Sequence, residues 1–237
     1  MKIAVYTLTR DRLEFTQHCF QTLWANAGAP FDHFVLDNGS QDGTPQWLKE
    51  NENKFRAVEC APVNLGISKG SNMMLDKIFE AGAYELIIKL DNDCEVKSPY
   101  ILKRIEWVVG MFRTRERVIV LSPRVEGIVR QPARLSVLMY PGGKIGLTAI
   151  IGGLFHIVPA EIYRRYRYPE ELPLAWGQDD HFCDWLHRQG VDTGYIEDLV
   201  VAHYLTTDGQ AKKYPEYFKR KRQEEKPSGA DQGGKPK

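Results

Sequence analysis

Two patterns of hydrophobic residues alternate through the first half of the chain. Continuous apolar runs predict buried β-strands, and apolar residues three or four positions apart predict helices that pack on a sheet. Strand-like runs fall at residues 2–9, 33–38, 55–61 and 84–90, and helical patterns at residues 13–27, 44–53 and 68–82. Strands that alternate with helices in this order predict an α/β fold with a mostly parallel sheet.

Two of these helices carry signals for their ends. Thr44 followed by Pro45 predicts an N-cap and a first helical residue, because proline leaves no N–H unsatisfied there and its fixed φ suits a helix. Gly82 predicts the end of the helix at residues 68–82. The start of the helix at residues 44–53 and the end of the helix at 68–82 therefore follow from local sequence.

The second half is mixed in pattern. A helix is predicted over residues 98–113 and a strand over 117–125, and residues 134–158 form β-rich pieces on either side of a Pro-Gly-Gly turn. A helix from about Asp179 to Gln189 then precedes one or two strands before Tyr204. From Lys219 onward the chain is charged and rich in Gly and Pro, which predicts a disordered tail.

Composition narrows the classes of partner. A formal net charge of +1 argues against duplex nucleic acid, whose partners usually carry a strong basic excess. The four cysteines are widely spaced and include no C-x-x-C pair, so we expect reduced thiols in a cytoplasmic protein. No targeting segment is expected at residues 1–10, and the apolar stretch at 145–158 is too short to span a bilayer.

Polar clusters lie where the predicted strands end. "TRDR" follows the first strand, "LDNGSQDGT" ends the second and "LDNDCE" ends the fourth. In open parallel sheets, ligands bind outside the carboxyl ends of the strands, where loops meet helix N-termini. These clusters predict a crevice of nucleotide size.

Asp91 and Asp93 form a D-x-D pattern. If the strand geometry continued through them, both carboxylates would lie on one face and would repel each other unless a cation neutralised them. Mg²⁺ and Mn²⁺ prefer oxygen ligands and complete their coordination with water and phosphate. The alternative is a polar turn in which Asp91 caps the next segment.

Two further segments bear on the same crevice. Asp37 and Asn38 present donors and acceptors suited to a nucleobase or a ribose, although residues 39–43 also form a turn. In "NLGISKGSN", Asn64 and Gly66 stand where a loop enters a helix, and glycine lets the backbone approach a ligand closely. Lys69 near that helix start is either a phosphate ligand or a solvated surface lysine.

With these motifs in this order, the chain resembles the family 2 glycosyltransferases, inverting enzymes of the GT-A fold that use nucleotide-sugar donors. The likeness runs from Lys2 to about Tyr204: "VLDNGSQDGT" resembles the family's VDxxSxDGT signature, "NLGISKGSN" its NxGxxxxxN loop and "LDND" its metal motif. The resemblance implies a central, mostly parallel mixed sheet flanked by helices. It implies one domain over residues 1–210, with a donor-binding half at 1–97 and an acceptor-side half at 98–210, before a C-terminal helix or basic tail at 211–237.

The resemblance also assigns the donor and metal sites. The residues expected to bind the donor are Thr7, Arg10, Asp37, Asn38, Asn64, Gly66, Lys69, Asp91 and Asn92. Asp93 and His203 are expected to hold Mn²⁺ or Mg²⁺, with Asp91 as a further candidate. A lone histidine after a strand is more often structural, so only the accompanying motifs favour His203 as a ligand.

On the acceptor side, "WGQDDHFCDWLHRQG" resembles the family's GEDxDLxxRxxxxG segment. Residue-by-residue matching gives Asp179 the role of catalytic base, with Asp180 in reserve, because Gln178 and His181 depart from the family pattern. A helix N-terminus favours the ionised form that a base needs. The alternative is an N-cap aspartate on an amphipathic helix.

The remaining acceptor-side candidates are Gly152 and Gly153 in the "GGLFHIV" loop and Trp176. Trp176 either stacks on a sugar ring or packs in the core.

The function implied is metal-dependent transfer of a sugar from a UDP-, GDP- or dTDP-sugar to a hydroxyl acceptor with inversion. The acceptor is a glycan, a lipid-linked molecule or a small molecule. The rivals are a non-catalytic nucleotide-sugar or glycan-binding module and a sugar nucleotidylyltransferase, whose arginine-bearing glycine-rich loop is missing here. The basic run that begins at Lys219 is a solvated tail or a weak contact with the inner face of a membrane, which would make a cytoplasmic protein peripheral.

Overall fold

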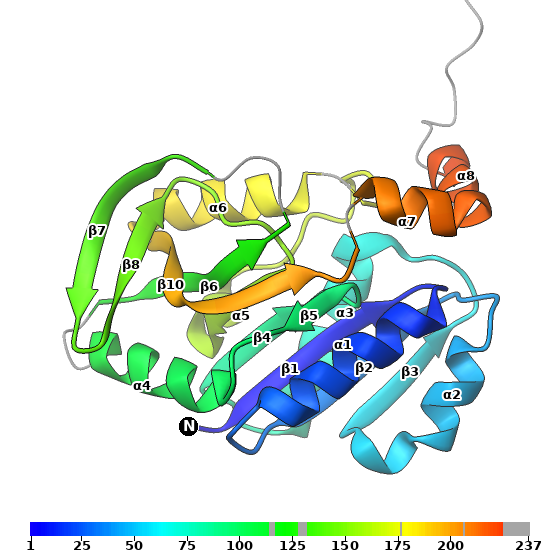
Figure 1. Cartoon of the computed structure of the whole chain (residues 1–237), viewed down its shortest axis with the longest axis horizontal. Helices are drawn as coiled ribbons and strands as arrows, with labels where there is room; N and C mark the ends of the chain where they lie inside the picture. The colour runs from blue at the N-terminus through cyan, green and yellow to red at the C-terminus, as the bar shows by residue number, and fades with distance from the viewer. Residues whose placement is uncertain (114–116, 128–131, 176, 206, 225–237) are drawn as a thin grey trace, which may run out of the picture.

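A computed structural model describes residues 1–113, 117–127, 132–175, 177–205 and 207–224 of the chain. Ten strands form one sheet with the order β3-β2-β1-β4-β9-β6-β10-β8-β7, and β5 pairs with β10 off this path. Helices flank the sheet (Figure 1). The expected α/β fold with a mixed central sheet is confirmed.

The first half of the sheet is parallel. Its four strands lie side by side, β1 between β2 and β4, and β2 next to β3. The elements are β1 (Ile3–Thr9), α1 (Leu13–Asn26), β2 (Asp32–Asn38), α2 (Thr44–Glu50), a 3₁₀ turn (Glu52–Lys54), β3 (Ala57–Ala61), α3 (Gly66–Ala81) and β4 (Leu86–Leu90). Their carboxyl ends meet at one edge, as the alternation of strands and helices predicted.

The second half mixes directions. Strand β9 is antiparallel to both β4 and β6, whereas β10 is parallel to β6 and antiparallel to β5 and β8. The elements are β5 (Cys94–Val96), α4 (Ile101–Arg113), β6 (Ile119–Glu126), β7 (Arg134–Tyr140), β8 (Gly143–Thr148), β9 (Phe155–Pro159), α5 (Ala160–Arg165), α6 (Gln178–Arg188), β10 (Asp192–His203), α7 (Thr207–Lys213) and α8 (Pro215–Glu224). Antiparallel β9 therefore joins the two parallel groups.

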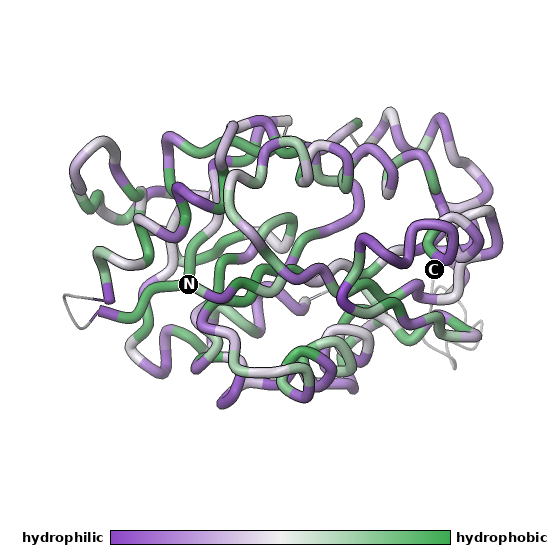
Figure 2. The backbone as a smooth tube through the Cα atoms, turned by 90° about the horizontal axis from the view of Figure 1, so that it is seen from below, coloured by the Kyte–Doolittle hydropathy of each residue, from purple (hydrophilic) through white to green (hydrophobic). Residues whose placement is uncertain are grey.

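The core lies between the sheet and its helices. Every residue of β4 and β9 is buried, as expected for central strands that are covered on both faces. Along the backbone, hydrophobic and hydrophilic stretches alternate in short segments (Figure 2). Among the helices that the structure describes, none is long and apolar enough to cross a membrane.

Two local expectations need correction. The N-cap of α2 is Gly43 and not Thr44; the Thr44 N–H donates to Asp42 Oδ1 over 2.9 Å, so Asp42, one residue before the N-cap, provides the side-chain acceptor. Residues 219–224 are helical and form the end of α8, because the apolar side chains at the start of that helix pack against the body of the protein. Residues 225–237 lie outside the described residues.

Candidate functional site

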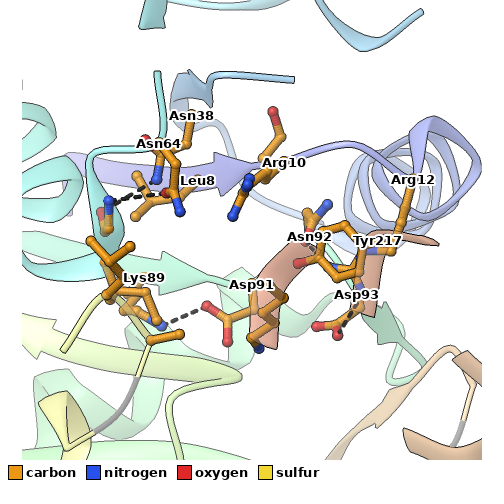
Figure 3. A pocket seen from close by; sticks show the side chains of 16 residues that line it. Leu8, Arg10, Arg12, Asn38, Asn64, Lys89, Asp91, Asn92, Asp93 and Tyr217 are labelled. Carbon is orange, nitrogen blue, oxygen red and sulfur yellow. Dashed lines mark hydrogen bonds and ion pairs between the residues drawn. The ribbon is translucent and has the colours of Figure 1, made fainter. Parts of the chain in front are cut away.

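A pocket with about 800 Å³ of open space lies at the carboxyl ends of β1, β2 and β4, beside the start of α3 (Figure 3). It brings together most of the segments that the sequence singled out. Its lining residues are Leu8, Thr9, Arg10, Arg12, Asn38, Asn64, Gly66, Ile67, Lys89, Asp91, Asn92, Asp93, Leu174, Ala175, Tyr217 and Lys221. Four cations against two carboxylates leave an excess of two positive charges, which suits an anionic ligand.

Asp37 and Asn38 organise one end of the pocket from the tip of β2. Asp37 accepts from the backbone N–H of Ser40 over 3.0 Å and from the hydroxyl groups of Ser40 and Thr9, so the turn predicted after β2 is formed. Burial raises the pKa of the Asp37 carboxyl, although these hydrogen bonds oppose the shift. Asn38 ties the two motif loops together, because its Oδ1 accepts from the Leu65 N–H over 2.8 Å.

Three of the expected donor residues do not line this pocket: Thr7, Lys69 and Asp37, whose carboxyl is buried in the turn after β2. Thr7 is fully buried within β1 and its hydroxyl is 3.2 Å from His33 Nε2, so it belongs to the core. Lys69 is exposed on α3 one turn beyond the helix start. For Lys69 the solvated alternative fits the structure, and for Thr7 the expectation is corrected by its orientation away from the cavity.

Asp91 and Asp93 do not share a strand face. Strand β4 ends at Leu90, and the Cys94 N–H donates to the Asp91 carbonyl over 3.1 Å, which makes residues 91–94 a turn. The two carboxylates therefore diverge: Asp91 faces Lys89, while Asp93 faces the segments at Arg12 and Gln210 (Figure 3).

Lys89 joins the two sides of the site. Its buried ammonium donates to Asp91 Oδ1 over 2.5 Å and to the Gly153 carbonyl over 2.7 Å. Burial alone lowers the pKa of Lys89, but the carboxylates of Asp91 and Asp179 outweigh it and raise that pKa above its ordinary value. The charge on Lys89 is therefore fixed near neutral pH. Lys89 is not among the residues expected from the sequence, although a lysine inside a strand that is otherwise apolar is a signal for a buried ion pair.

Asp179 binds the same residue, Gly153. The Gly153 N–H donates to Asp179 Oδ2 over 2.8 Å, so the backbone of Gly153 binds Lys89 through its carbonyl and Asp179 through its N–H. A Cβ atom at position 153 would lie 2.5 Å from Asp179 Oδ1, so a larger residue there would displace the Asp179 carboxylate. Gly152 is held next to it, since its N–H donates to the Tyr195 hydroxyl over 2.9 Å.

The neighbours of Asp179 have structural partners of their own. Asp180 is exposed, and Gln178 is buried with its amide donating to the Pro173 carbonyl over 2.6 Å. His181 Nδ1 is 3.0 Å from the Tyr166 hydroxyl. Asp179 is thus the carboxylate that faces the rest of the site. Trp176 lies outside the described residues.

Asp93 is held by three separate segments. Gln210 Nε2 donates to its Oδ2 over 3.2 Å, Arg12 Nη1 lies 3.7 Å from the same atom, and His203 Nδ1 lies 4.0 Å from Oδ1. Arg12 itself donates to Gln210 and to the buried amide of Asn92, over 2.6 Å and 3.3 Å. This network orients Asp93 with one oxygen towards His203.

The donor set fits a divalent cation that also binds a ligand. Two atoms that each lie about 2.1 Å from one ion are separated by about 3–4 Å, so Asp93 Oδ1 and His203 Nδ1 are near enough to share one after a small adjustment. No group of three or more His, Cys, Asp or Glu side chains in the described part of the chain could hold a metal alone. The rest of the coordination would come from water and from ligand phosphates.

The C-terminal helix α8 adds residues that the motif analysis did not include. Tyr217 and Lys221 line the pocket, and the Arg12 guanidinium lies 4.4 Å from the centre of the Tyr217 ring. Arg220 donates to Asp11 Oδ2 over 2.6 Å, which fastens α8 to the loop after β1. The basic run at 219–222 was the available signal, but no local pattern indicates that this segment packs against the loop after β1.

This arrangement is the GT-A fold. The chain is similar to the solved structure of TarS residues 1–349 from S. aureus, with a TM-score of 0.65 and 16% identity over 94% of this chain and 65% of that one. It is similar to the mannosyltransferase PcManGT from Pyrobaculum calidifontis in complex with GDP-Man and Mn²⁺, with a TM-score of 0.63 and 13% identity over 93% and 60% of the two chains.

A third similar structure is GalNAc-T7 with UDP, GalNAc and Mn²⁺, at a TM-score of 0.69 and 14% identity over 88% and 45% of the two chains. The chain thus spans less than two thirds of the length of each of these proteins. No family model matches the sequence, and no curated protein matches it. At these identities the likeness establishes the fold.

Proposed function

We propose that the chain is a metal-dependent glycosyltransferase that moves a sugar from a nucleotide-sugar to a hydroxyl acceptor with inversion. The observation that carries the proposal is the single pocket in which Asn38, Asn64, Asp91 and Asp93, from three separate motifs, meet an excess of positive charge. TarS has been solved with UDP-GlcNAc and PcManGT with GDP-Man, which supports a nucleotide-sugar as the ligand.

The donor's nucleoside would occupy the end of the pocket at Asn38 and Asn64, next to the turn that Asp37 stabilises. Its diphosphate would lie between Arg10, Arg12 and Lys221, where opposite charges compensate. Asp93 and His203 would hold Mn²⁺ or Mg²⁺, which when bound neutralises the charge that develops on the leaving diphosphate. Asp91, oriented by Lys89, would contact the ribose or water at the same place.

Asp179 would act as general base. It takes the proton of the acceptor hydroxyl while the hydroxyl oxygen forms a bond to the anomeric carbon and the bond from that carbon to the diphosphate breaks. The nucleoside diphosphate leaves with the electron pair. A single base suffices, since direct displacement needs no second carboxylate as nucleophile. The hydrogen bond from the Gly153 N–H would hold Asp179 in the orientation that this step requires.

Product analysis with a panel of UDP-, GDP- and dTDP-sugars and Mn²⁺ tests the proposal. Release of nucleoside diphosphate from one class of donor, abolished in Asp93→Ala and Asp179→Asn, is the expected result. Hydrolysis of the donor by water suffices as a readout when the acceptor is not supplied. The stereochemistry of the product, followed by NMR of the anomeric proton, tests inversion.

Other outcomes point to the two rival functions. Donor binding without any release, in the presence of an extract that contains acceptors, supports a non-catalytic binding module. Pyrophosphate release from a nucleoside triphosphate and a sugar phosphate supports a nucleotidylyltransferase. The donor panel and the acceptor extract also identify the donor sugar and the acceptor. A contact of the basic helix α8 with a membrane is part of the same proposal, and co-sedimentation with anionic vesicles tests it.

A further inference from the structure

A second cavity, with about 960 Å³ of open space, lies between α4 and the turn that joins β7 to β8. Figure 1 shows this turn next to α4, at the end of the molecule opposite α7 and α8. We call this cavity the α4 groove. Its lining residues are Tyr100, Lys103, Arg104, Trp107, Val108, Tyr140, Pro141, Gly142, Asp198 and Leu199. None of them belongs to the nucleotide pocket.

Two aromatic side chains are exposed along the α4 groove. Trp107 is 50% exposed and Tyr100 64% exposed, although large aromatic side chains usually bury most of their surface. The Trp107 ring meets the ring of the buried Tyr140 edge to face, with 5.7 Å between the centres, and Gly142 lies against its outer edge. Tyr140 therefore holds the plane of Trp107 and leaves a face of the indole open to a ligand.

The backbone at Tyr100 is strained. Tyr100 has φ 55°, in the left-handed region that residues other than glycine, asparagine and aspartate rarely adopt. It packs against Gly28, where a Cβ atom would lie 2.6 Å from the Tyr100 Cα. A conformation that costs free energy and holds an exposed aromatic side chain at the mouth of a cavity is a reason to look for a ligand there.

The polar groups of the α4 groove compensate one another. The Arg104 guanidinium donates to the Asp198 carboxylate and, over 3.2 Å, to the Asp198 carbonyl, and the Tyr140 hydroxyl donates to the same carboxylate. Asp198 lies where β10 shifts register against β6 between Ile196 and Val200, and this irregularity turns it into the groove. The groove thus offers both donors and acceptors with little net charge.

We propose that the α4 groove binds a neutral oligosaccharide. A sugar ring has an apolar face, which stacks on an indole or phenol ring, and a rim of hydroxyl groups that both donate and accept hydrogen bonds. A phosphate or an acidic peptide would be favoured by a cluster of unpaired cations, whereas Arg104 is already paired with Asp198 and Lys103 is the one other cation among the lining residues. This inference extends the proposed function, because the groove would hold a glycan acceptor away from the site of transfer.

Binding can be measured without a donor, so the result is independent of turnover. The probe is a panel of unmodified oligosaccharides of glucose, mannose, galactose and N-acetylglucosamine, titrated in the millimolar range and followed by NMR of the indole and backbone N–H signals, the latter being present in every variant. We expect at least one series to shift the Trp107 signal. Trp107→Ala should weaken oligosaccharide binding roughly tenfold or more, and Trp107→Phe should weaken it less, because it keeps an aromatic ring.

Matched variants separate binding from folding. Leu135→Ala, at another exposed apolar side chain on β7, should bind as the unchanged protein does. Tyr100→Gly removes the aromatic ring, so the variant should bind the oligosaccharide more weakly. It also relieves the left-handed strain, so its thermal midpoint should stay equal or rise. A purely structural Tyr100 would show no loss of binding in this variant.

Three results would overturn the inference. One is the absence of binding across the panel. Another is binding that Trp107→Ala leaves unchanged. The third is a concentration-dependent dimer, seen by light scattering and abolished by Trp107→Ala, since the groove would then be an interface between copies of the chain.

Discussion

Two carboxylates at the proposed site, Asp93 and Asp179, are held in different ways. Asp93 is surrounded by side chains from three distant segments, at Arg12, His203 and Gln210. Asp179 depends on one backbone N–H from Gly153 and on its place at the start of α6. The donor side is therefore a network of polar and charged side chains from the loop after β1, the end of β10 and helix α7. The acceptor side is a local turn against one helix, and the two sides should respond differently to substitution.

The largest effect is expected from Asp179→Asn. An amide cannot take the proton of the acceptor, so the rate constant of transfer should fall by about 10²–10⁴-fold while donor affinity changes little. Single-turnover kinetics and calorimetry of donor binding give the two numbers. The neighbouring Asp180→Asn is the matched control and should retain activity, because Asp180 is exposed. Loss in Asp180→Asn with activity retained in Asp179→Asn would exchange their roles.

Lys89→Met tests the link between the two sides. It removes the ammonium that binds both Asp91 and the Gly153 carbonyl, so both Asp91 and the loop that holds Asp179 should lose their orientation. We expect turnover to fall by roughly 10–100-fold and the free energy of unfolding by about 1–3 kcal/mol, because a buried carbonyl loses its partner. Urea denaturation measures the second quantity. The double variant with Asp179→Asn should lose less than the sum of the two single losses, and full additivity would show that Lys89 and Asp179 act independently.

Lys221 and Lys219 give a matched pair on α8. Lys221 lines the pocket, whereas the Lys219 side chain is 63% exposed. Lys221→Ala should raise the donor KM by roughly tenfold with little change in kcat, since a phosphate contact is lost. Lys219→Ala removes the same charge and should leave KM unchanged. Equal effects of the two substitutions would mean that only the net charge of the helix matters.

The smallest effect concerns stability against acid. Burial lowers the pKa of His33 to about 3 and that of His156 to about 4, so both are neutral in the folded protein. The unfolded chain binds their protons near pH 6.5, and therefore stability should fall as the pH drops below that value, by about 1.4 kcal/mol per pH unit for each histidine. Denaturation at pH 7, 6 and 5 measures the slope. His33→Phe should roughly halve it, and an unchanged slope would mean that other groups set the acid sensitivity.

Local patterns predicted the parallel half of the fold and the positions of most site segments. Strand and helix periods, Gly82 and the polar strand ends located β1 to β4 and the pocket, because these features depend on neighbours in sequence. Strand β9 between β4 and β6, and the short helix α5, follow from long-range packing of residues 155–165 that no local period shows.

The same distinction holds at the site. Asp91, Asp93 and Asp179 carry motif signals, but the turn that separates Asp91 from Asp93 needs the backbone hydrogen bond at Cys94. Tyr217 and Lys221 reach the pocket only because α8 folds back over the loop after β1. The resemblance led us to expect Thr7 at the donor site, whereas its register in β1 turns it towards His33.

The central claim is that the pocket at Asp93 binds a nucleoside diphosphate together with a divalent cation. Calorimetric titration of UDP and GDP, with Mn²⁺ and with a chelator, tests it most directly. We expect at least one of the two nucleotides to bind, and we expect this binding to depend on Mn²⁺ and to be lost in Asp93→Ala. Asp179→Asn should bind the nucleotide as the unchanged protein does. Binding that Asp93→Ala leaves intact, or no binding of either nucleotide with Mn²⁺ present, would contradict it.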